Sequence, residues 1–216
     1  MSPERAIGWA WAVWVLSWFA AAVWARRTEK SAGLGAEALH LAVTCLGLFL
    51  VFARFGNFDG VPHRGPWAFE VPSALTWPVP PALGWALFAV AVAGFAFCWW
   101  ARLHLGQLWS GSVTRKPGHL VVDTGPYALV RHPIYTGLIL AAAATALDRG
   151  SAFNVAGAVL VIVGFWIKAR LEERFLRAEL GAQAYDDYAR RVPMLVPQPF
   201  PPPGGRGRGG GGAASG

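Results

Sequence analysis

Five apolar segments are the feature that most restricts how this chain can fold. They cover residues 7–25, 38–53, 82–101, 134–147 and 151–167. A helix needs roughly 20 mostly apolar residues to cross a bilayer, within a range of about 17–25. The first, third and fifth segments meet this length, and the other two are shorter. We therefore predict an all-α, multi-pass membrane protein with about five transmembrane helices.

The composition is typical of a membrane protein. Only 14% of the 216 residues are charged, whereas soluble domains usually carry about 25%, and the chain contains 12 Trp. Both cysteines, Cys45 and Cys98, lie inside apolar segments. We interpret them as buried apolar side chains rather than as a disulfide.

The net charge of +7 comes mostly from residues beside the apolar segments. If all five segments cross the membrane, most of the 19 Lys and Arg fall on one side. This asymmetry predicts an N-terminus outside and a C-terminus in the cytoplasm. We expect the membrane to be a bacterial plasma membrane. Because no zinc-finger spacing or aromatic RNA-binding signature accompanies the charges, we expect lipid headgroups rather than nucleic acid as their partners.

The chain becomes amphipathic after the fifth segment. Leu171, Phe175 and Ala178 recur at helical spacing among charged residues. This pattern predicts a C-terminal cytoplasmic amphipathic helix that extends into or along the cytoplasmic surface and ends at Val192 and Pro193.

The connections differ in length and composition. Residues 54–81 are rich in Pro and Gly and form either an interfacial loop or a lid over an opening to the lipid. Residues 148–150 are so few that the fourth and fifth segments must form a tight helical hairpin. Residues 198–216 are mostly Pro and Gly, which predicts disorder and leaves 1–197 as a single membrane domain.

A concentrated polar motif precedes the fourth apolar segment. Pro133 suits the first turn of a helix, which places His132 near the N-cap. A helix N-terminus offers free N–H groups, so that Arg131 and His132 together would hold a carboxylate or a phosphate there. The alternatives are a positive residue facing lipid headgroups and a capping histidine.

Two tyrosines belong to the same motif. Tyr127 follows a Gly-Pro turn, and Tyr135 lies one turn into the predicted helix. Their ring faces suit a cation such as a sulfonium or an amine. An interfacial aromatic belt explains them equally well.

Two further features flank the motif. Residues 118–122 form a short extended stretch whose backbone groups either pair with a planar ligand or pack as an ordinary loop. Glu172 and Glu173 follow the fifth segment, at helical i,i+4 spacing to Lys168 and Arg177 respectively. They form surface ion pairs, or one of them turns toward a ligand. The histidines lack metal-ligand spacing, and Rossmann and Walker A motifs are absent, so we expect no metal.

These motifs together resemble the isoprenylcysteine carboxyl methyltransferase family, whose relatives methylate phospholipid amines or small thiols. The similarity extends over about 95–197 and combines the Gly-Pro-Tyr turn, the Arg-His-Pro motif, the Glu pair and the Tyr-rich ending at 185–193. It implies that S-adenosylmethionine binds in a cytosol-facing pocket made by the last two membrane helices and their flanking segments. The cofactor contacts that it carries over to this chain are His119, Leu120, Val121, Val122, Tyr127, His132, Pro133, Ile134, Tyr135 and Glu173.

The resemblance also implies which residues position the methyl acceptor. They are Arg131, Lys168 and Glu172. Lys168 stands where the family has Arg, and a lysine cannot grip a carboxylate with two parallel hydrogen bonds. Ser112 stands where the family has Gln.

The function expected from this resemblance is methyl transfer from S-adenosylmethionine to a small or lipophilic acceptor. An isoprenylcysteine-type carboxylate is the first expectation. A phospholipid amine or a thiol is an alternative acceptor, but these need a base, and the sequence shows no isolated buried one. An NADPH-dependent sterol-type reductase and a non-enzymatic carrier are the other classes that remain open.

Overall fold

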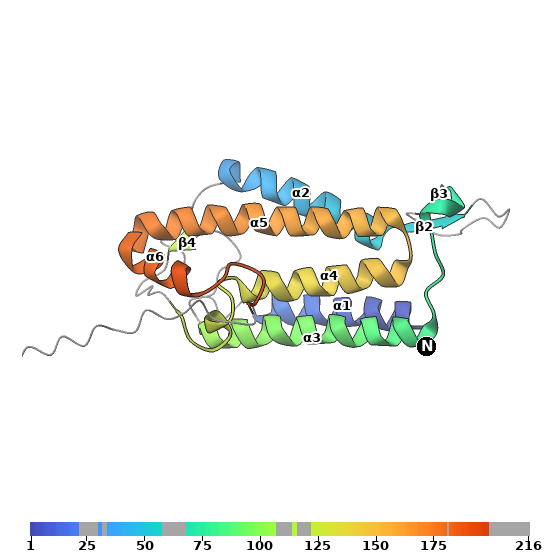
Figure 1. The fold of residues 1–216 in the computed structure, drawn as a ribbon, viewed down its shortest axis with the longest axis horizontal. Coiled ribbons are helices and arrows are strands. Elements are labelled where there is room, and N and C mark those ends of the chain that lie inside the picture. The colour runs from blue at the N-terminus through green and yellow to red at the C-terminus, as the bar shows by residue number, and fades with distance from the viewer. Residues whose placement is uncertain are drawn as a thin grey trace, which may run out of the picture.

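The computed structural model describes residues 1–21, 30–31, 34–57, 68–106, 114–115, 122–180 and 182–198. The described chain is predominantly helical, as predicted. Its helices lie side by side in one elongated bundle, apart from the short last helix at one end (Figure 1). They are α1 Pro3–Ala20, α2 Leu34–Phe52, α3 Pro81–Leu105, α4 Pro133–Arg149, α5 Ala152–Leu180 and α6 Ala182–Arg191.

Short strands lie at both ends of the bundle. β1 (Lys30–Ser31) pairs antiparallel with β4 (Thr114–Arg115), and β2 (Arg54–Asn57) pairs parallel with β3 (Ala68–Val71). Single 3-10 turns, η2 (Ser73–Leu75) and η4 (Gly125–Ala128), complete the elements. Part of the 54–81 connection is therefore paired strand. Residues 58–67, which the lid interpretation needs, lie outside the described residues.

Two parts of the bundle are long and apolar enough to cross a membrane, namely Pro81–Leu105 and Ala152–Ala178. Glu37–Phe52, within α2, is a shorter apolar helix. Large apolar side chains on the outer surface, such as Trp9, Leu39 and Val159, are more than half exposed. An apolar exterior of this kind is suited to lipid rather than water.

The turn between α4 and α5 is as tight as predicted. Gly150 ends α4 in the left-handed conformation with φ 65°, and its N–H bonds to the carbonyl of Leu147. Its own carbonyl accepts a hydrogen bond of 2.8 Å from the N–H of Trp77. A side chain at Gly150 would be strained and would collide with Trp77, so glycine is required here.

Helices α2 and α5 run antiparallel and approach closely through small residues. A Cβ atom on Gly47 would lie 2.8 Å from the backbone nitrogen of Val161, and one on Gly157 would lie 2.7 Å from Cβ of Leu50. Small residues at helix interfaces bring backbones together in this way inside membranes. The contact fixes the register in which the polar residues of the two helices face one another.

The segment after residue 167 is arranged differently from a separate surface helix. Helix α5 continues without a break to Leu180, and the chain then reverses into α6. Tyr185, Tyr188 and Val192 form a small buried cluster that holds α6 and the residues after it against the bundle. The end of α5 therefore projects beyond its apolar part and carries charged side chains toward α6.

Candidate functional site

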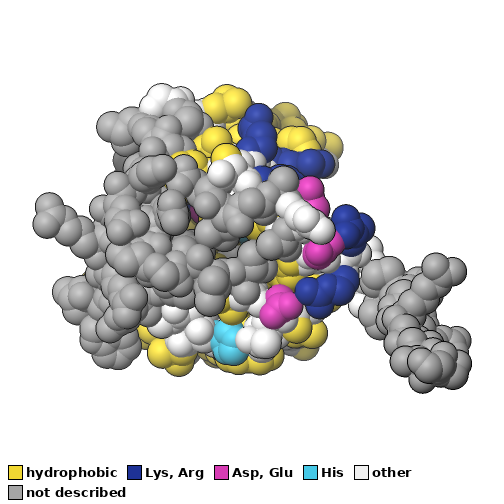
Figure 2. Space-filling model, turned by 90° about the vertical axis from the view of Figure 1, so that its left-hand side faces the viewer, with side chains coloured by type: hydrophobic (Ala, Val, Ile, Leu, Met, Phe, Trp, Pro, Cys, Tyr) yellow, Lys and Arg dark blue, Asp and Glu magenta, His cyan; other side chains and the backbone are white. Residues whose placement is uncertain are grey.

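The residues singled out by the polar motif meet at one end of the bundle. The start of α4, the last turns of α5, α6 and the segment after α6 converge there, at the left of Figure 1. Figure 2 looks onto this end and shows Lys, Arg, Asp and Glu side chains gathered along one side of it.

Backbone pairing explains how the start of α4 is held. The N–H groups of Arg131 and His132 donate to the carbonyls of Pro193 and Met194, at 2.8 and 3.1 Å. One turn later, the hydroxyl of Thr136 donates to another carbonyl of the same segment at 2.6 Å. The chain after α6 thus runs beside the α4 N-terminus and fixes the two residues on which the site depends.

Arg131 joins α5 to the end of α6. Its Nε lies 2.7 Å from Oε1 of Glu173, and these side chains are only 10% and 1% exposed. Its Nη1 donates to the carbonyls of Ala189 and Val192 at 2.9 and 2.5 Å. A guanidinium suits the last carbonyls of a helix because both the hydrogen bonds and the helix dipole favour a cation there.

His132 bridges the two adjacent glutamates. Its Nδ1 lies 3.4 Å from Oε2 of Glu172, and its Nε2 lies 3.3 Å from Oε1 of Glu173. Burial alone would lower the pKa of His132, but the hydrogen bonds and charges of the two carboxylates together raise it above its ordinary value. A charged imidazolium, which donates from both ring nitrogens, fits this position.

Tyr135 completes the cluster around Glu172. Its hydroxyl donates to Oε1 of Glu172 at 2.5 Å. Its ring stacks on His132 with centroids 5.3 Å apart and on Phe165 at 5.0 Å. The Lys168 ammonium lies 5.4 Å from the centroid of the same ring. The motif predicted that a tyrosine ring would face a cation. In the structure the cation near the Tyr135 ring is the side chain of Lys168.

The structure brings six of the predicted site residues together and places others nearby. The six, which we call the acid–base cluster, are Arg131, His132, Tyr135, Lys168, Glu172 and Glu173.

The remaining predicted residues have structural partners or lie outside the description. Pro133 is buried in the first turn of α4, and the carbonyl of Ile134 accepts a hydrogen bond from the thiol of Cys98 at 3.3 Å. Tyr127 is buried, and burial together with the charge of Glu172 raises the pKa of its hydroxyl. Val122 is half-buried before η4. His119, Leu120 and Val121 lie outside the described residues.

Two polar residues on α2 were missed by the sequence analysis. Glu37 and His40 are buried, with 7% and 3% exposure. Lys168 and Glu172 lie within electrostatic range of His40. An acid and a histidine three residues apart in an apolar segment are the signal that would have found them, because ionisable groups at membrane depth face the protein interior.

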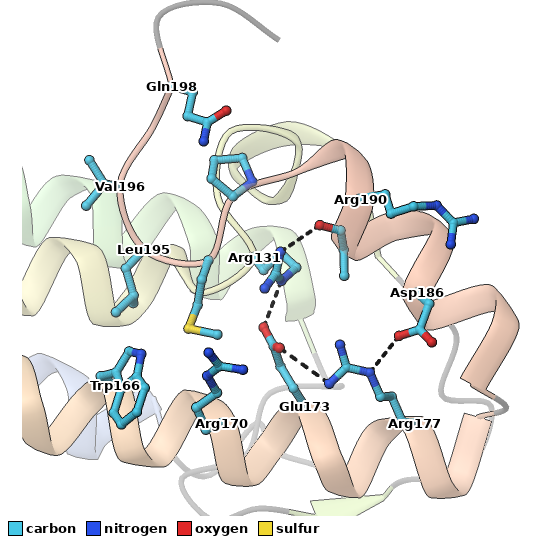
Figure 3. A pocket seen from close by; sticks show the side chains of 13 residues that line it. Arg131, Trp166, Arg170, Glu173, Arg177, Asp186, Arg190, Leu195, Val196 and Gln198 are labelled. Carbon is cyan, nitrogen blue, oxygen red and sulfur yellow. Dashed lines mark hydrogen bonds and ion pairs between the residues drawn. The ribbon is translucent and has the colours of Figure 1, made fainter. Parts of the chain in front are cut away.

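An open cavity of about 780 Å³ lies on another side of the cluster, between α5, α6 and the segment after α6 (Figure 3). Arg131, Glu173 and Arg177 form its wall through ion pairs that continue to Asp186. The α5 residues that line the cavity include Arg170 and Glu173 but, among the described residues, not Lys168 or Glu172. Glu172 and Glu173 therefore lie on different faces of α5.

No three metal-binding side chains gather anywhere in the described ranges. The donor set of the cluster is instead two carboxylates, one guanidinium, one lysine amine, one imidazole and one phenol. These groups can bind a zwitterionic ligand and can hold or move a proton.

The fold and the cluster define a helical bundle with two apolar helices of membrane-spanning length and a buried acid–base cluster at one end. The sequence model of the isoprenylcysteine carboxyl methyltransferase (ICMT) family matches residues 86–178. The predicted resemblance to this family is therefore confirmed over α3, α4 and most of α5. The matched range contains the whole acid–base cluster.

Individual relatives bear related names. Methanethiol S-methyltransferase 2 of Bradyrhizobium diazoefficiens is 46% identical over 76 residues, which are 34% of this chain and 27% of that protein. Methanethiol S-methyltransferase of a Pseudomonas species is 32% identical over 167 residues, which are 75% and 60% of the two chains. Protein-S-isoprenylcysteine O-methyltransferase of Schizosaccharomyces pombe is 33% identical over 100 residues, which are 45% and 42%. The chain thus spans less than two thirds of the length of each of these relatives.

Proposed function

We propose that this chain is an integral membrane methyltransferase that moves a methyl group from S-adenosylmethionine to a small or lipophilic acceptor. The observation that carries the proposal is that the family match, residues 86–178, contains all six residues of the acid–base cluster. The cluster thus lies in the part of the chain that is similar to methyltransferases.

The groups of the cluster fit this donor. S-adenosylmethionine carries an ammonium, a carboxylate and a sulfonium. Glu172 keeps 18% of its side chain exposed and can accept from an ammonium or a ribose hydroxyl. Helix α4 has no side-chain cap on its first turn, so its N-terminal N–H groups suit the carboxylate. We propose that His132, Pro133, Ile134, Tyr135 and Glu173 line this part of the donor site, together with Tyr127 and residues 119–122.

The chemistry that the donor supplies when bound is an electrophilic methyl group on a positively charged sulfur. The protein's contribution is to position and to exclude water. Arg131 and His132 hold the two glutamates in place, and Tyr135 fixes Glu172 by its short hydrogen bond. Lys168 and Glu172 lie on one face of α5, one turn apart, where they can orient an acceptor.

The acceptor belongs to one of two chemical classes suggested by the relatives' names. An isoprenylcysteine presents a carboxylate, which is already ionised and needs only alignment. A thiol such as methanethiol must lose a proton before it becomes a good nucleophile. A phospholipid amine would need a base in the same way. Lys168 offers a carboxylate one point charge and no bidentate grip, so it does not favour the carboxylate class.

We propose that helices α1–α5 cross the membrane and that the acid–base cluster faces the cytoplasm. The excess of Lys and Arg predicted for that side supports this orientation. The apolar outer surface of α5, including Val159 and Trp166, lets a lipophilic acceptor approach from the bilayer. Residues 1–197 form one catalytic domain in this proposal.

Transfer of a labelled methyl group tests the proposal. The detergent-purified protein is incubated with methyl-labelled S-adenosylmethionine and, separately, an isoprenylcysteine, an alkanethiol and a lipid amine. We expect label in at least one acceptor, and loss of most of it in Glu172→Gln. Glu70→Gln, which changes an exposed carboxylate on β3 at the opposite end, is the matched control and should transfer normally. Absence of label in every acceptor, with oxidation of NADPH in a parallel assay, would place the protein among reductases.

A further inference from the structure

His40 is a buried imidazole in the middle of an apolar helix. Its side chain is 3% exposed, and within the described part of the chain its Nδ1 has no hydrogen-bond partner. A buried polar atom without a partner has lost its hydrogen bonds to water and gained none in the protein, which destabilises the fold. The presence of such a group in a folded protein therefore needs an explanation, such as a bound ligand or a chemical role.

The register of α2 against α5 places His40 beside the acid–base cluster. In this antiparallel pair, Gly47 packs against Val161, and one turn earlier Thr44 packs against Gly164. A further turn along each helix brings His40 level with Lys168. The electrostatic influence of Lys168, Glu37 and Glu172 on His40 agrees with this register.

A second ionisable residue on α2, Glu37, also lies near the acid–base cluster. Glu37 lies one turn before His40 and is within electrostatic range of Tyr135. Thr44, one turn after His40, is half-buried; its hydroxyl oxygen is buried and has no partner among the described residues. Two buried polar atoms without a partner among the described residues therefore lie on the face of α2 that meets α5. The Thr44 hydroxyl packs against Gly164, whereas the His40 ring lies one turn further along, level with Lys168.

His40 differs from the other histidine near the site. Both ring nitrogens of His132 face carboxylates, so that ring is committed to holding Glu172 and Glu173. A neutral imidazole has one acceptor nitrogen. Burial and the positive charge of Lys168 favour the neutral form of His40, while the nearby carboxylates Glu37 and Glu172 favour the charged form. A neutral His40 has an acceptor nitrogen, which the charged ring of His132 lacks.

We propose that the methyl acceptor of this enzyme is a thiol and that His40 accepts its proton. The inference rests on the proposed methyltransferase function and deepens it. The S–H proton moves to the acceptor nitrogen of His40 while the sulfur electron pair forms the new bond to the methyl carbon. The bond from that carbon to the sulfonium sulfur breaks, and its electron pair neutralises the donor sulfur. The products are a methyl thioether, S-adenosylhomocysteine and protonated His40.

Two thiols that differ in acidity test the inference. An alkanethiol must be deprotonated at neutral pH, whereas an aromatic thiol is already largely ionised. We expect His40→Asn to lower kcat for the alkanethiol by roughly 100-fold or more, as for loss of a general base. The aromatic thiol should lose only a few-fold, because it brings its own thiolate. Binding of S-adenosylhomocysteine, measured by calorimetry, should remain as in the wild type and shows that the variant is folded.

Thr44→Val is the matched control, since it removes the other unpartnered polar atom from the same face of α2. We expect its two thiol activities to match the wild type. If His40→Asn lowered the activity on both thiols equally, the role of His40 as a base would be overturned. The same holds if Thr44→Val lost as much alkanethiol activity as His40→Asn. A wild-type protein that methylates an isoprenylcysteine but neither thiol would overturn this inference and leave the proposed function standing. A wild-type protein that neither binds S-adenosylhomocysteine nor methylates any acceptor would overturn both.

Discussion

The two ends of the bundle each carry a cluster of acids and arginines, but the clusters differ in burial. At one end Glu4 pairs with Arg54 at 2.8 Å and with Arg149, and the Glu4 and Arg54 side chains are 38% and 57% exposed. At the other end Glu173 is 1% exposed and Arg131 is 10% exposed. Of the three residues in the first cluster Arg149 alone is well buried, at 16% exposure, whereas both residues of the second are enclosed by α4, α5 and α6.

This difference separates an ordinary ion pair from a candidate site. Exposed pairs are typically worth about 0–1 kcal/mol, because water competes and the side chains lose freedom. Breaking a buried pair by removing one partner costs about 3–5 kcal/mol, since the other charge stays buried. A buried cluster is therefore a poor device for stability alone, and its position within a family-matched region favours a chemical role.

The largest effect is expected for Glu173→Gln. The substitution leaves Arg131 and His132 buried beside a neutral amide, so we expect the free energy of unfolding to fall by about 3–5 kcal/mol. Glu4→Gln at the other end should lower it by less than about 1 kcal/mol. Denaturant unfolding of both variants in mild detergent measures the contrast. Similar losses in the two variants would contradict the distinction between the two ends.

The next effect concerns donor binding. Glu172→Ala and Tyr135→Ala should lose measurable binding of S-adenosylmethionine while they remain folded. Tyr135→Phe removes only the 2.5 Å hydrogen bond to Glu172, and we expect it to weaken binding by roughly 10- to 100-fold, the usual worth of a hydrogen bond to a charged group. Calorimetric titration measures all three variants. Affinity equal to that of the wild type in Glu172→Ala and Tyr135→Ala would remove these residues from the donor site.

A smaller effect is expected from pH, because the pKa of His132 in the folded protein is raised above its ordinary value of 6.5. The stabilisation by the charged ring is fully present below pH 6.5 and is lost as the pH rises through the folded pKa. Each unit of this shift corresponds to about 1.4 kcal/mol. Denaturant unfolding at a series of pH values should show this decline in the wild type and a flatter profile in His132→Asn. The same decline in both proteins would assign it to other groups.

The smallest effect is expected at the C-terminus. Truncation after Pro197 removes a Pro/Gly-rich tail that cannot bury an apolar core, so methyl transfer should be unchanged. The labelled-methyl assay compares the truncated and full-length proteins. A loss of more than a few-fold would show that the tail takes part in the reaction or in folding.

The sequence predicted the helical fold and singled out the six residues that the structure brings together in the acid–base cluster, because both depend on local patterns. The apolar segments predicted four of the long helices with bounds close to those observed, and Pro133 indicated the start of α4. The pattern failed to separate α5 from a surface helix, since charged residues extend the same helix to Leu180. The bridging role of His132 depends on how α4 lies against α5, which no local pattern encodes.

His40 shows the limit most clearly. Its position in an apolar segment was visible, but its proximity to Lys168 depends on the glycine-mediated register of α2 and α5. Long-range register is set by packing, so the sequence could indicate that His40 faces the protein interior but not that it lies beside Lys168. The segment 119–121, expected to contact the cofactor, lies outside the described residues and remains a prediction.

The central claim is that the acid–base cluster belongs to an S-adenosylmethionine site. The measurement that tests it most directly is calorimetric titration of the detergent-purified protein with S-adenosylmethionine, S-adenosylhomocysteine and NADPH. The account predicts micromolar binding of both adenosyl compounds, loss of that binding in Glu172→Ala, and no binding of NADPH. Binding of NADPH alone, or of none of the three, would contradict it.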